Sequence, residues 1–416
     1  MTMNTKRRRV QDKLAGLPGV RPVRRPVSPD GAEEFDLYYV RTGRKSAHPL
    51  VIIPGGPGVA SVQVYTGLRR RAAAAGLDVI MIEHRGVGMS RHVDSGSDLP
   101  PQALTVNQVV DDVAAVLDDA HVQSALVYGT SYGTYVAAGV GVRHPGRVRA
   151  MILDSPLLSR DDITMARQAI RGVLLKGDSP ETAALAPKVR KLVDAGVMTA
   201  SAGQLAATVY GYGGPPLLDR QLDLLLDERT MLWRNLSRFT NMVNRKVPYR
   251  FEADLVNRIA FRELDYAPEP DGLPLDPAVA IRETLKGIAG FEAEPYDLVA
   301  EMTKFGWPTV VISGGRDLVT PPAVAQRIAS LVPNAVLLPL PTAAHSALDF
   351  REPAALAIAG AVWRGELDSL AARASTLDAL PARPALRLLW KAIELAAVAE
   401  DALPAVPVPR RRVRSA

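Results

Sequence analysis

The segment Gly129-Thr130-Ser131-Tyr132-Gly133 has the spacing Gly-x-Ser-x-Gly, which can present a nucleophilic serine. An apolar run at 124–128 precedes it and a small-residue stretch at 135–143 follows, which predicts a strand-to-helix turn at the serine. Such a turn holds the serine in a strained backbone conformation with its hydroxyl above the sheet. Side chains at the two flanking glycines would clash with the neighbouring strand or helix. We therefore predict that Ser131 is a nucleophile.

A serine hydroxyl needs a base, and the chain offers six histidines. His345 follows the last predicted strand, in a loop of small residues that lets an imidazole face an open cleft. It is also the histidine that completes the chain order Ser, Asp, His, which is typical of one class of serine hydrolases. We predict that His345 takes the proton of Ser131.

The imidazole in turn needs an acid that fixes its tautomer and stabilises its cationic form. Asp317 stands in a glycine-rich loop just beyond the apolar run 309–313, and 28 residues before His345. Asp154, at the end of the predicted strand 148–153, is the competing candidate. Chain order favours Asp317.

The negative charge that forms on a substrate carbonyl needs hydrogen-bond donors. Residues 54–58 (Pro-Gly-Gly-Pro-Gly) follow a short apolar run, and their glycines leave backbone N–H groups unobstructed. We predict an oxyanion hole made by the N–H groups of Gly56 and Tyr132, the latter being the residue after the nucleophile.

Short apolar runs and helical stretches alternate along two parts of the chain, which is typical of a mostly parallel central sheet with helices on both faces. We predict an α/β core at residues 31–155 and 301–370. Residues 156–300 contain helical stretches separated by Gly/Pro breakers, and we expect a helical cap there. Residues 1–30 are predicted to form a flexible basic arm, and residues 371–416 a helical segment with a basic tail.

The composition excludes several classes of protein. The 416 residues include no cysteine, so a disulfide scaffold, a cysteine zinc site and thiol catalysis are excluded. No His pair stands four residues apart with an acid between, and we expect neither a metal nor an organic cofactor. No stretch approaches the ~20 apolar residues of a membrane span. A basic N-terminus without an apolar segment after it argues against a secretory signal, so we expect a cytoplasmic protein.

The formal net charge of +6 is concentrated at the two ends of the chain. Residues 1–26 carry a net +7, and the last ten residues add four arginines, so the remainder is mildly acidic. Basic tails can contact nucleic acid or an anionic surface. Solvated chain ends are the more common explanation, and no aromatic residues stand among the arginines to stack on bases. The sequence leaves the oligomeric state open.

Together these motifs resemble the α/β-hydrolase superfamily and, more narrowly, proline iminopeptidases and their tripeptidyl aminopeptidase relatives. The similarity lies in the loop at 55–58, in the Arg-Gly-x-Gly-x-Ser segment at 85–90, in the nucleophile region at 131–135 and in the acid loop at 314–321. Two positions depart from the pattern. Pro54 replaces a histidine and His84 replaces a glutamine.

The resemblance implies an α/β-hydrolase fold with a helical cap, and a serine peptidase that cleaves an N-terminal residue, proline first among them, from short peptides. It also implies a cap carboxylate for the substrate amine, and Glu263 is the candidate in the stretch 259–266. Pairing with Arg258 or Arg262 on a helix face is the other interpretation of Glu263. A carboxylesterase or lipase-like hydrolase with the same triad stays an alternative, as does a catalytically silent hydrolase fold that acts as a binding protein.

Overall fold

The computed structural model describes residues 3–29, 31–243, 246–284 and 290–403. It divides into two compact units. The first contains residues 1–166, 245–269 and 284–383, and the second contains residues 167–244, 270–283 and 384–416. Every predicted site residue belongs to the first unit. In the described parts of the chain, no helix combines the length and apolar character needed to cross a bilayer.

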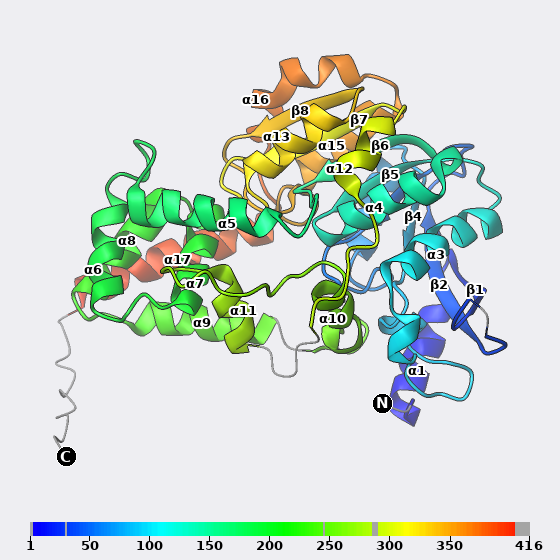
Figure 1. Cartoon of the computed structure of the whole chain (residues 1–416), viewed down its shortest axis with the longest axis horizontal. Coiled ribbons are helices and arrows are strands. Elements are labelled where there is room, and N and C mark those ends of the chain that lie inside the picture. The colour runs from blue at the N-terminus through cyan, green and yellow to red at the C-terminus, as the bar shows by residue number, and fades with distance from the viewer. Residues whose placement is uncertain (1–2, 30, 244–245, 285–289, 404–416) are drawn as a thin grey trace. The chain divides into compact units, whose positions relative to one another are not determined.

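Eight strands of the described residues form one sheet in the order β1-β2-β4-β3-β5-β6-β7-β8 (Figure 1). The β1–β2 and β2–β4 pairs are antiparallel and all other pairs are parallel. This confirms the predicted fold class. The strands are β1 (Val20–Pro26), β2 (Glu34–Thr42), β3 (Leu50–Ile53), β4 (Val79–Ile82), β5 (Ala125–Thr130), β6 (Val148–Asp154), β7 (Thr309–Gly314) and β8 (Ala335–Leu340).

The sheet is covered on both faces, because its central strands are buried along their whole length. One apolar cluster contains residues of α3, α4 and α13, and a second contains residues of α1, α2, α14, α15 and α16. Helices of the first unit are α1 (Thr5–Ala15), α2 (Thr66–Ala74), α3 (Val106–Asp119), α4 (Tyr132–Arg143), α10 (Ala253–Arg262), α12 (Leu298–Glu301), α13 (Pro322–Leu331), α14 (Ala347–Phe350), α15 (Glu352–Trp363) and α16 (Ala374–Asp378).

The second unit is helical. Its helices are α6 (Leu185–Asp194), α7 (Ala200–Thr208), α8 (Pro215–Leu226), α9 (Met231–Val243), α11 (Pro277–Thr284) and α17 (Pro384–Ala402), and α5 (Asp162–Arg171) begins in the first unit and ends in the second. Glu400 of α17 accepts the N–H groups of Met231 and Leu232 at 2.7 Å each, at the start of α9. The C-terminal helix thus packs with helices of the predicted cap, whereas residues 245–269 of that cap belong to the first unit.

The predicted helical segment at residues 371–402 contains two α-helices, α16 and α17, separated by a break. The helix α16 ends at Asp378 and α17 begins at Pro384, and Pro381 lies in the break. A proline lacks the N–H that a helix interior requires and clashes with the preceding turn, which accounts for the interruption. The predicted basic tail falls in residues 404–416, outside the described residues.

The described residues of the predicted arm include the helix α1 and the strand β1. Asn4 caps α1 by accepting the N–H of Arg7 at 2.9 Å, and Val20–Pro26 pairs with β2 as an edge strand. An edge strand tolerates prolines because one of its sides has no ladder to complete. Some of the arginines that suggested a solvated arm have acidic partners, since Arg7 pairs with Glu252 and Arg25 with Asp112. The pairing partners lie far away in sequence and could not be read from the segment itself.

Candidate active site

Ser131 lies at the turn between β5 and α4, with φ 52° and ψ −125°. A Cβ atom on Gly129 would lie 2.2 Å from the carbonyl oxygen of Gly133, and one on Gly133 would lie 2.1 Å from that of Ile53. Both glycines are therefore required by the close approach of backbone to backbone, as the sequence predicts. The positive φ of a non-glycine residue is strained, and this turn keeps Ser131 partly exposed at the carboxyl edge of the sheet.

The structure brings three predicted side chains together. His345 Nε2 lies 2.9 Å from Ser131 Oγ, and His345 Nδ1 lies 2.9 Å from Asp317 Oδ2. Asp317 is fully buried, and the His345 side chain keeps 18% of its surface exposed. An ionised carboxylate can only accept hydrogen bonds, so Nδ1 carries the proton and donates to Asp317, and Nε2 accepts the hydrogen bond of the Ser131 hydroxyl. This is the hydrogen-bond arrangement of a Ser-His-Asp triad.

Electrostatics strengthen the pair of Asp317 and His345. Burial alone would raise the pKa of Asp317, but the charge and hydrogen bond of His345, with further hydrogen bonds, hold it below its ordinary value. Burial alone would lower the pKa of His345, but attraction and hydrogen bonding to Asp317 raise it above its ordinary value. The site therefore favours a negative Asp317 and stabilises a protonated His345, which is the state a general base enters when it takes a proton.

Thr320 is a candidate site residue that the sequence patterns did not indicate. Its hydroxyl donates to Asp317 Oδ2 at 2.9 Å and lies 3.3 Å from His345 Nδ1. Asp317 Oδ1 accepts the N–H groups of Val319 and Thr320, each at 2.9 Å. The spacing of an aspartate three residues before a threonine in a loop is a known local hydrogen-bonding pattern and could have signalled it.

Asp154, the competing acid, has another role. Its carboxylate is fully buried and accepts the N–H groups of Ala347 at 3.0 Å and Leu348 at 2.8 Å, at the start of α14. It also accepts the hydroxyl of Tyr128 at 3.0 Å. Asp154 therefore holds the segment that directly follows His345, while Asp317 contacts the imidazole.

The 54–58 loop lies against the serine. A Cβ atom on Gly55 would be 3.2 Å from the Cβ of Ser131, and Gly56 has φ 133°, a conformation that favours glycine. Tyr132 is the first residue of α4, so its N–H has no acceptor within the helix. Gly55 and Tyr132 thus both adjoin Ser131, and the oxyanion hole made by the N–H groups of Gly56 and Tyr132 stays a prediction.

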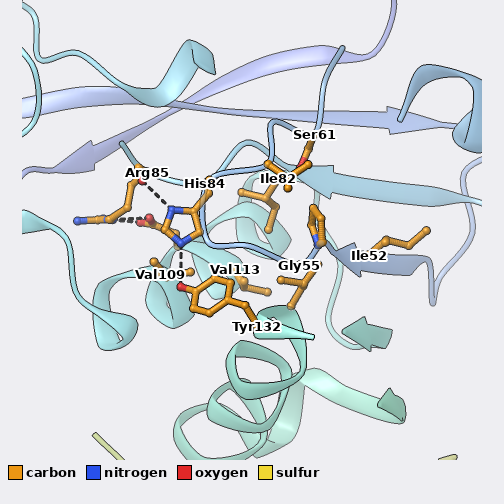
Figure 2. Close-up of a pocket in the computed structure, with 14 residues that line it drawn as sticks. Ile52, Gly55, Ser61, Ile82, His84, Arg85, Val109, Val113 and Tyr132 are labelled. Atoms are coloured by element: carbon orange, nitrogen blue, oxygen red, sulfur yellow. Dashed lines mark hydrogen bonds and ion pairs between the residues drawn. The ribbon is translucent and has the colours of Figure 1, made fainter. Parts of the chain in front are cut away.

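A small cavity opens beside this loop (Figure 2). Its inner volume of about 30 Å³ would hold one or two water molecules. His84 and Tyr132 meet at its edge, with His84 Nε2 2.9 Å from the Tyr132 hydroxyl and His84 Nδ1 2.6 Å from the Arg85 carbonyl. The apolar part of the lining includes Ile52, Ile53, Ile82, Val109 and Val113.

His84 is held in its neutral form. The Arg85 carbonyl is an acceptor, so Nδ1 carries the proton and Nε2 accepts from Tyr132. Burial lowers the pKa of His84 to about 4. His84 therefore acts as a hydrogen-bonding group between the Arg85 carbonyl and the Tyr132 hydroxyl and not as a cation.

Glu263 lies at the end of α10 and is 8% exposed. Its Oε2 accepts the N–H of Val106, the first residue of α3, at 2.8 Å. Arg262 pairs with Glu292 at 2.8 Å. Burial raises the pKa of Glu263, and its charge acts on the hydroxyl of Tyr132. One carboxylate oxygen of Glu263 is therefore already engaged at the start of α3.

Comparisons with known proteins agree with the fold. A sequence profile described as the alpha/beta hydrolase fold matches residues 48–190. Proline iminopeptidase from Neisseria meningitidis is 25% identical over 142 residues, covering 34% of this chain and 43% of that protein. Proline iminopeptidase from Arabidopsis thaliana is 26% identical over 127 residues, covering 30% of each chain. The matched region therefore spans less than half of the length of these two relatives.

A solved structure extends the fold comparison over most of the chain. The crystal structure of proline iminopeptidase from Mycobacterium smegmatis has a TM-score of 0.50 and 16% sequence identity, and the match covers 84% of this chain and 99% of that one. At this identity the likeness is one of fold. The chain has the α/β-hydrolase fold, and its sequence resembles that of proline iminopeptidases.

Proposed function

We propose that the chain is a serine hydrolase that acts through an acyl-enzyme on short peptides with a free N-terminus. The observation that carries the proposal is the hydrogen-bonded series Ser131, His345, Asp317, with both distances at 2.9 Å. A strained serine, an imidazole whose Nε2 contacts the serine hydroxyl, and a buried carboxylate held in its ionised form would act as nucleophile, base and orienting acid.

In the first half-reaction Ser131 Oγ attacks the substrate carbonyl while its proton passes to His345 Nε2. The negative charge on the carbonyl oxygen is received by the N–H groups of Gly56 and Tyr132, with the positive end of α4 behind the second of them. The C–N bond then breaks, and His345 gives its proton to the leaving amine. The acyl group remains as an ester of Ser131.

In the second half-reaction His345 takes a proton from water, and the resulting hydroxide oxygen attacks the same carbonyl. The ester bond breaks, the proton returns to Ser131 Oγ, and the free acid leaves. Asp317 keeps its charge throughout and stabilises His345 in its cationic form.

The proposed substrate class follows from the resemblance to proline iminopeptidases. An N-terminal residue, proline first among them, would supply the acyl group, and a carboxylate would bind its amine. Glu263 is the proposed anchor, because it is a buried acid in the stretch 259–266 that resembles the cap segment of those enzymes. An incoming ammonium group would pair with this carboxylate and compensate its burial.

Ester hydrolysis by the same triad is the second candidate function. The specific observation in its favour is that Glu263 Oε2 already accepts the N–H of Val106. An ester substrate needs no amine anchor. Neither the proline at position 54 in place of a histidine nor the engaged Glu263 would therefore weaken its hydrolysis.

The two candidates are separated by comparing proline p-nitroanilide with a p-nitrophenyl ester as substrates of the full chain. We expect release of p-nitroaniline that disappears in Ser131→Ala. Turnover of the ester without turnover of the anilide would reject the peptidase proposal and favour the esterase.

A further inference from the structure

The first helix of the chain carries a buried cation. Arg7 is 6% exposed, whereas its neighbours Arg8 and Arg9 are exposed. Its guanidinium donates to both carboxylate oxygens of Glu252, at 2.6 and 3.0 Å, and to the carbonyl oxygen of Gly88 at 2.7 Å. A bidentate pair with a third bond fixes the guanidinium in one orientation.

Tyr249 ties the same helix to the same segment. The Arg7 guanidinium lies 4.6 Å from the centre of the Tyr249 ring, and the Tyr249 hydroxyl donates to the Arg7 carbonyl at 2.7 Å. Tyr249 itself has φ 60°, which is strained for an aromatic residue and needs surrounding contacts to persist. Arg7 of helix α1 supplies two such contacts, one from its guanidinium and one from its backbone carbonyl.

Glu252 connects Arg7 to two loops of the hydrolase core. Its fully buried carboxylate accepts the N–H of Gly88 at 2.9 Å and that of Tyr249 at 3.1 Å. Its backbone N–H donates to the carbonyl of Gly58 at 2.8 Å. Gly58 ends the loop that carries Gly56, so a single residue links the Arg7 cation to the proposed oxyanion hole.

Backbone pairing joins residues 59–60, just after the 54–58 loop, to residues 250–251. Val59 and Phe251 form an antiparallel bridge, and the N–H of Ala60 donates to the carbonyl of Arg250 at 2.9 Å. A Cβ atom on Gly58 would lie 2.7 Å from the Cα of Ala253, so the two chains are in close contact. Movement of residues 249–252 would therefore move the end of the 54–58 loop.

A second buried acid supports the other side of this stretch. Glu83 accepts the N–H groups of Ser61 at 2.6 Å and Val62 at 2.9 Å. Burial, with a smaller contribution from the charge of Glu252, raises the pKa of Glu83 to about 7 against the lowering effect of its backbone hydrogen bonds. Three arginines lie near these acids. Arg7 pairs with Glu252, and Arg91 lies 3.6 Å from it. Arg69 donates to the carbonyls of Ser61 and Val62. Removing Arg7 would leave Glu252 with weaker compensation beside another acid.

From this network we propose that Arg7 is a positioning residue for the oxyanion hole, acting through Glu252 on the 54–58 loop. The N-terminal helix is then a working part of the hydrolase and not an appended arm. The inference rests on the proposed function, because it assigns Arg7 an effect on the reaction of Ser131. Its defining consequence is a loss of kcat with little change in KM, because an oxyanion hole binds the transition state more strongly than the substrate.

The test uses the full chain with Arg7→Ala and Arg7→Lys, and Arg8→Ala as the matched control on the same helix. A fluorophosphonate probe titrates the reactive Ser131 sites, so that kcat for a p-nitrophenyl ester refers to folded enzyme alone. We expect Arg7→Ala to lower kcat about tenfold with KM within twofold, because displaced donors lose part of their effect. Arg7→Lys should recover part of the lost kcat, since lysine keeps the positive charge but cannot donate two parallel hydrogen bonds to Glu252.

Equal kcat per titrated site in Arg7→Ala and Arg8→Ala would overturn the inference, whatever their melting temperatures. If Arg7→Ala does not fold, the same comparison of Arg7→Lys with Arg8→Ala decides. A wild-type chain that neither binds the probe nor turns over either substrate would instead reject the proposed function, so the two failures are distinguishable.

Discussion

The Nε2 atom of His345 lies 2.9 Å from the Oγ atom of Ser131, although 214 residues separate them in the sequence. A turn positions one side chain of this contact, and a loop positions the other. Ser131 is placed by a strained turn between β5 and α4, and His345 is placed by a loop whose following residues are bound by Asp154. The proposed chemistry depends on both the turn and the loop, which makes the site sensitive to changes that touch neither side chain.

The raised pKa of His345 predicts an acidic limit to activity. Burial would lower this pKa, but Asp317 outweighs burial and raises it above 6.5. Only the neutral imidazole accepts the proton of Ser131, so kcat/KM should fall as the pH drops, beginning above pH 6.5.

The variant Asp317→Asn removes the charge that raises the pKa. The acidic limb of kcat/KM should therefore move to lower pH, while kcat drops by about 10⁴-fold. The pH profile of ester hydrolysis measures both effects. A limb that stays at the wild-type pH in this variant would show that Asp317 does not control His345.

Thr320 should matter although it cannot react. Thr320→Val removes the hydroxyl that donates to Asp317 and leaves a side chain of similar shape. We expect kcat to fall about tenfold, equivalent to about 1.4 kcal/mol, because Asp317 is then less firmly oriented. Thr303→Val, at an exposed threonine, is the control. Unchanged kcat in Thr320→Val would assign the threonine a role in packing alone.

The flanking glycine of the serine turn should resist substitution. In Gly133→Ala the new Cβ would lie 2.1 Å from the Ile53 carbonyl oxygen, so the backbone must shift. We expect the free energy of unfolding to fall by about 2 kcal/mol or more. Gly146→Ala is the matched control, since a Cβ there meets no heavy atom within 4 Å. Urea unfolding measures both, and equal stabilities would contradict the described turn.

Glu263 offers a test of the amine anchor. Glu263→Gln keeps an oxygen that can accept the Val106 N–H, so the fold should persist. If Glu263 binds the substrate amine, KM for proline p-nitroanilide should rise about tenfold or more, because a charge-assisted hydrogen bond is lost. KM for an ester without an amine should not change. Parallel changes for both substrates would remove Glu263 from amine recognition.

The predictable parts of the fold are those that a short, contiguous stretch of sequence encodes. The buried strands are short apolar runs, and the serine turn is encoded within five residues from Gly129 to Gly133. Asp317 and His345 were placed by the order in which strands end along the chain, because parallel strands present their carboxyl ends at one edge. The distances then found among the three side chains agree with that placement, and their catalytic roles stay predictions.

The parts that were missed depend on long-range partners. Arg7 and Glu252 are 245 residues apart, so nothing near Arg7 distinguishes it from the exposed Arg8. Glu263 was considered with the arginines of its own helix, but its partner is Val106, 157 residues away. Local charge patterns cannot reveal such pairs, because they arise only when the fold brings separate segments together.

The central claim is that Ser131 is an activated nucleophile, and labelling with a fluorophosphonate probe tests it most directly. The account predicts rapid covalent labelling of the full chain at Ser131, with labelling lost in Ser131→Ala and strongly slowed in His345→Ala. Absence of labelling in a folded wild-type chain, or equal labelling of Ser131→Ala, would contradict it and leave a hydrolase fold without hydrolase chemistry.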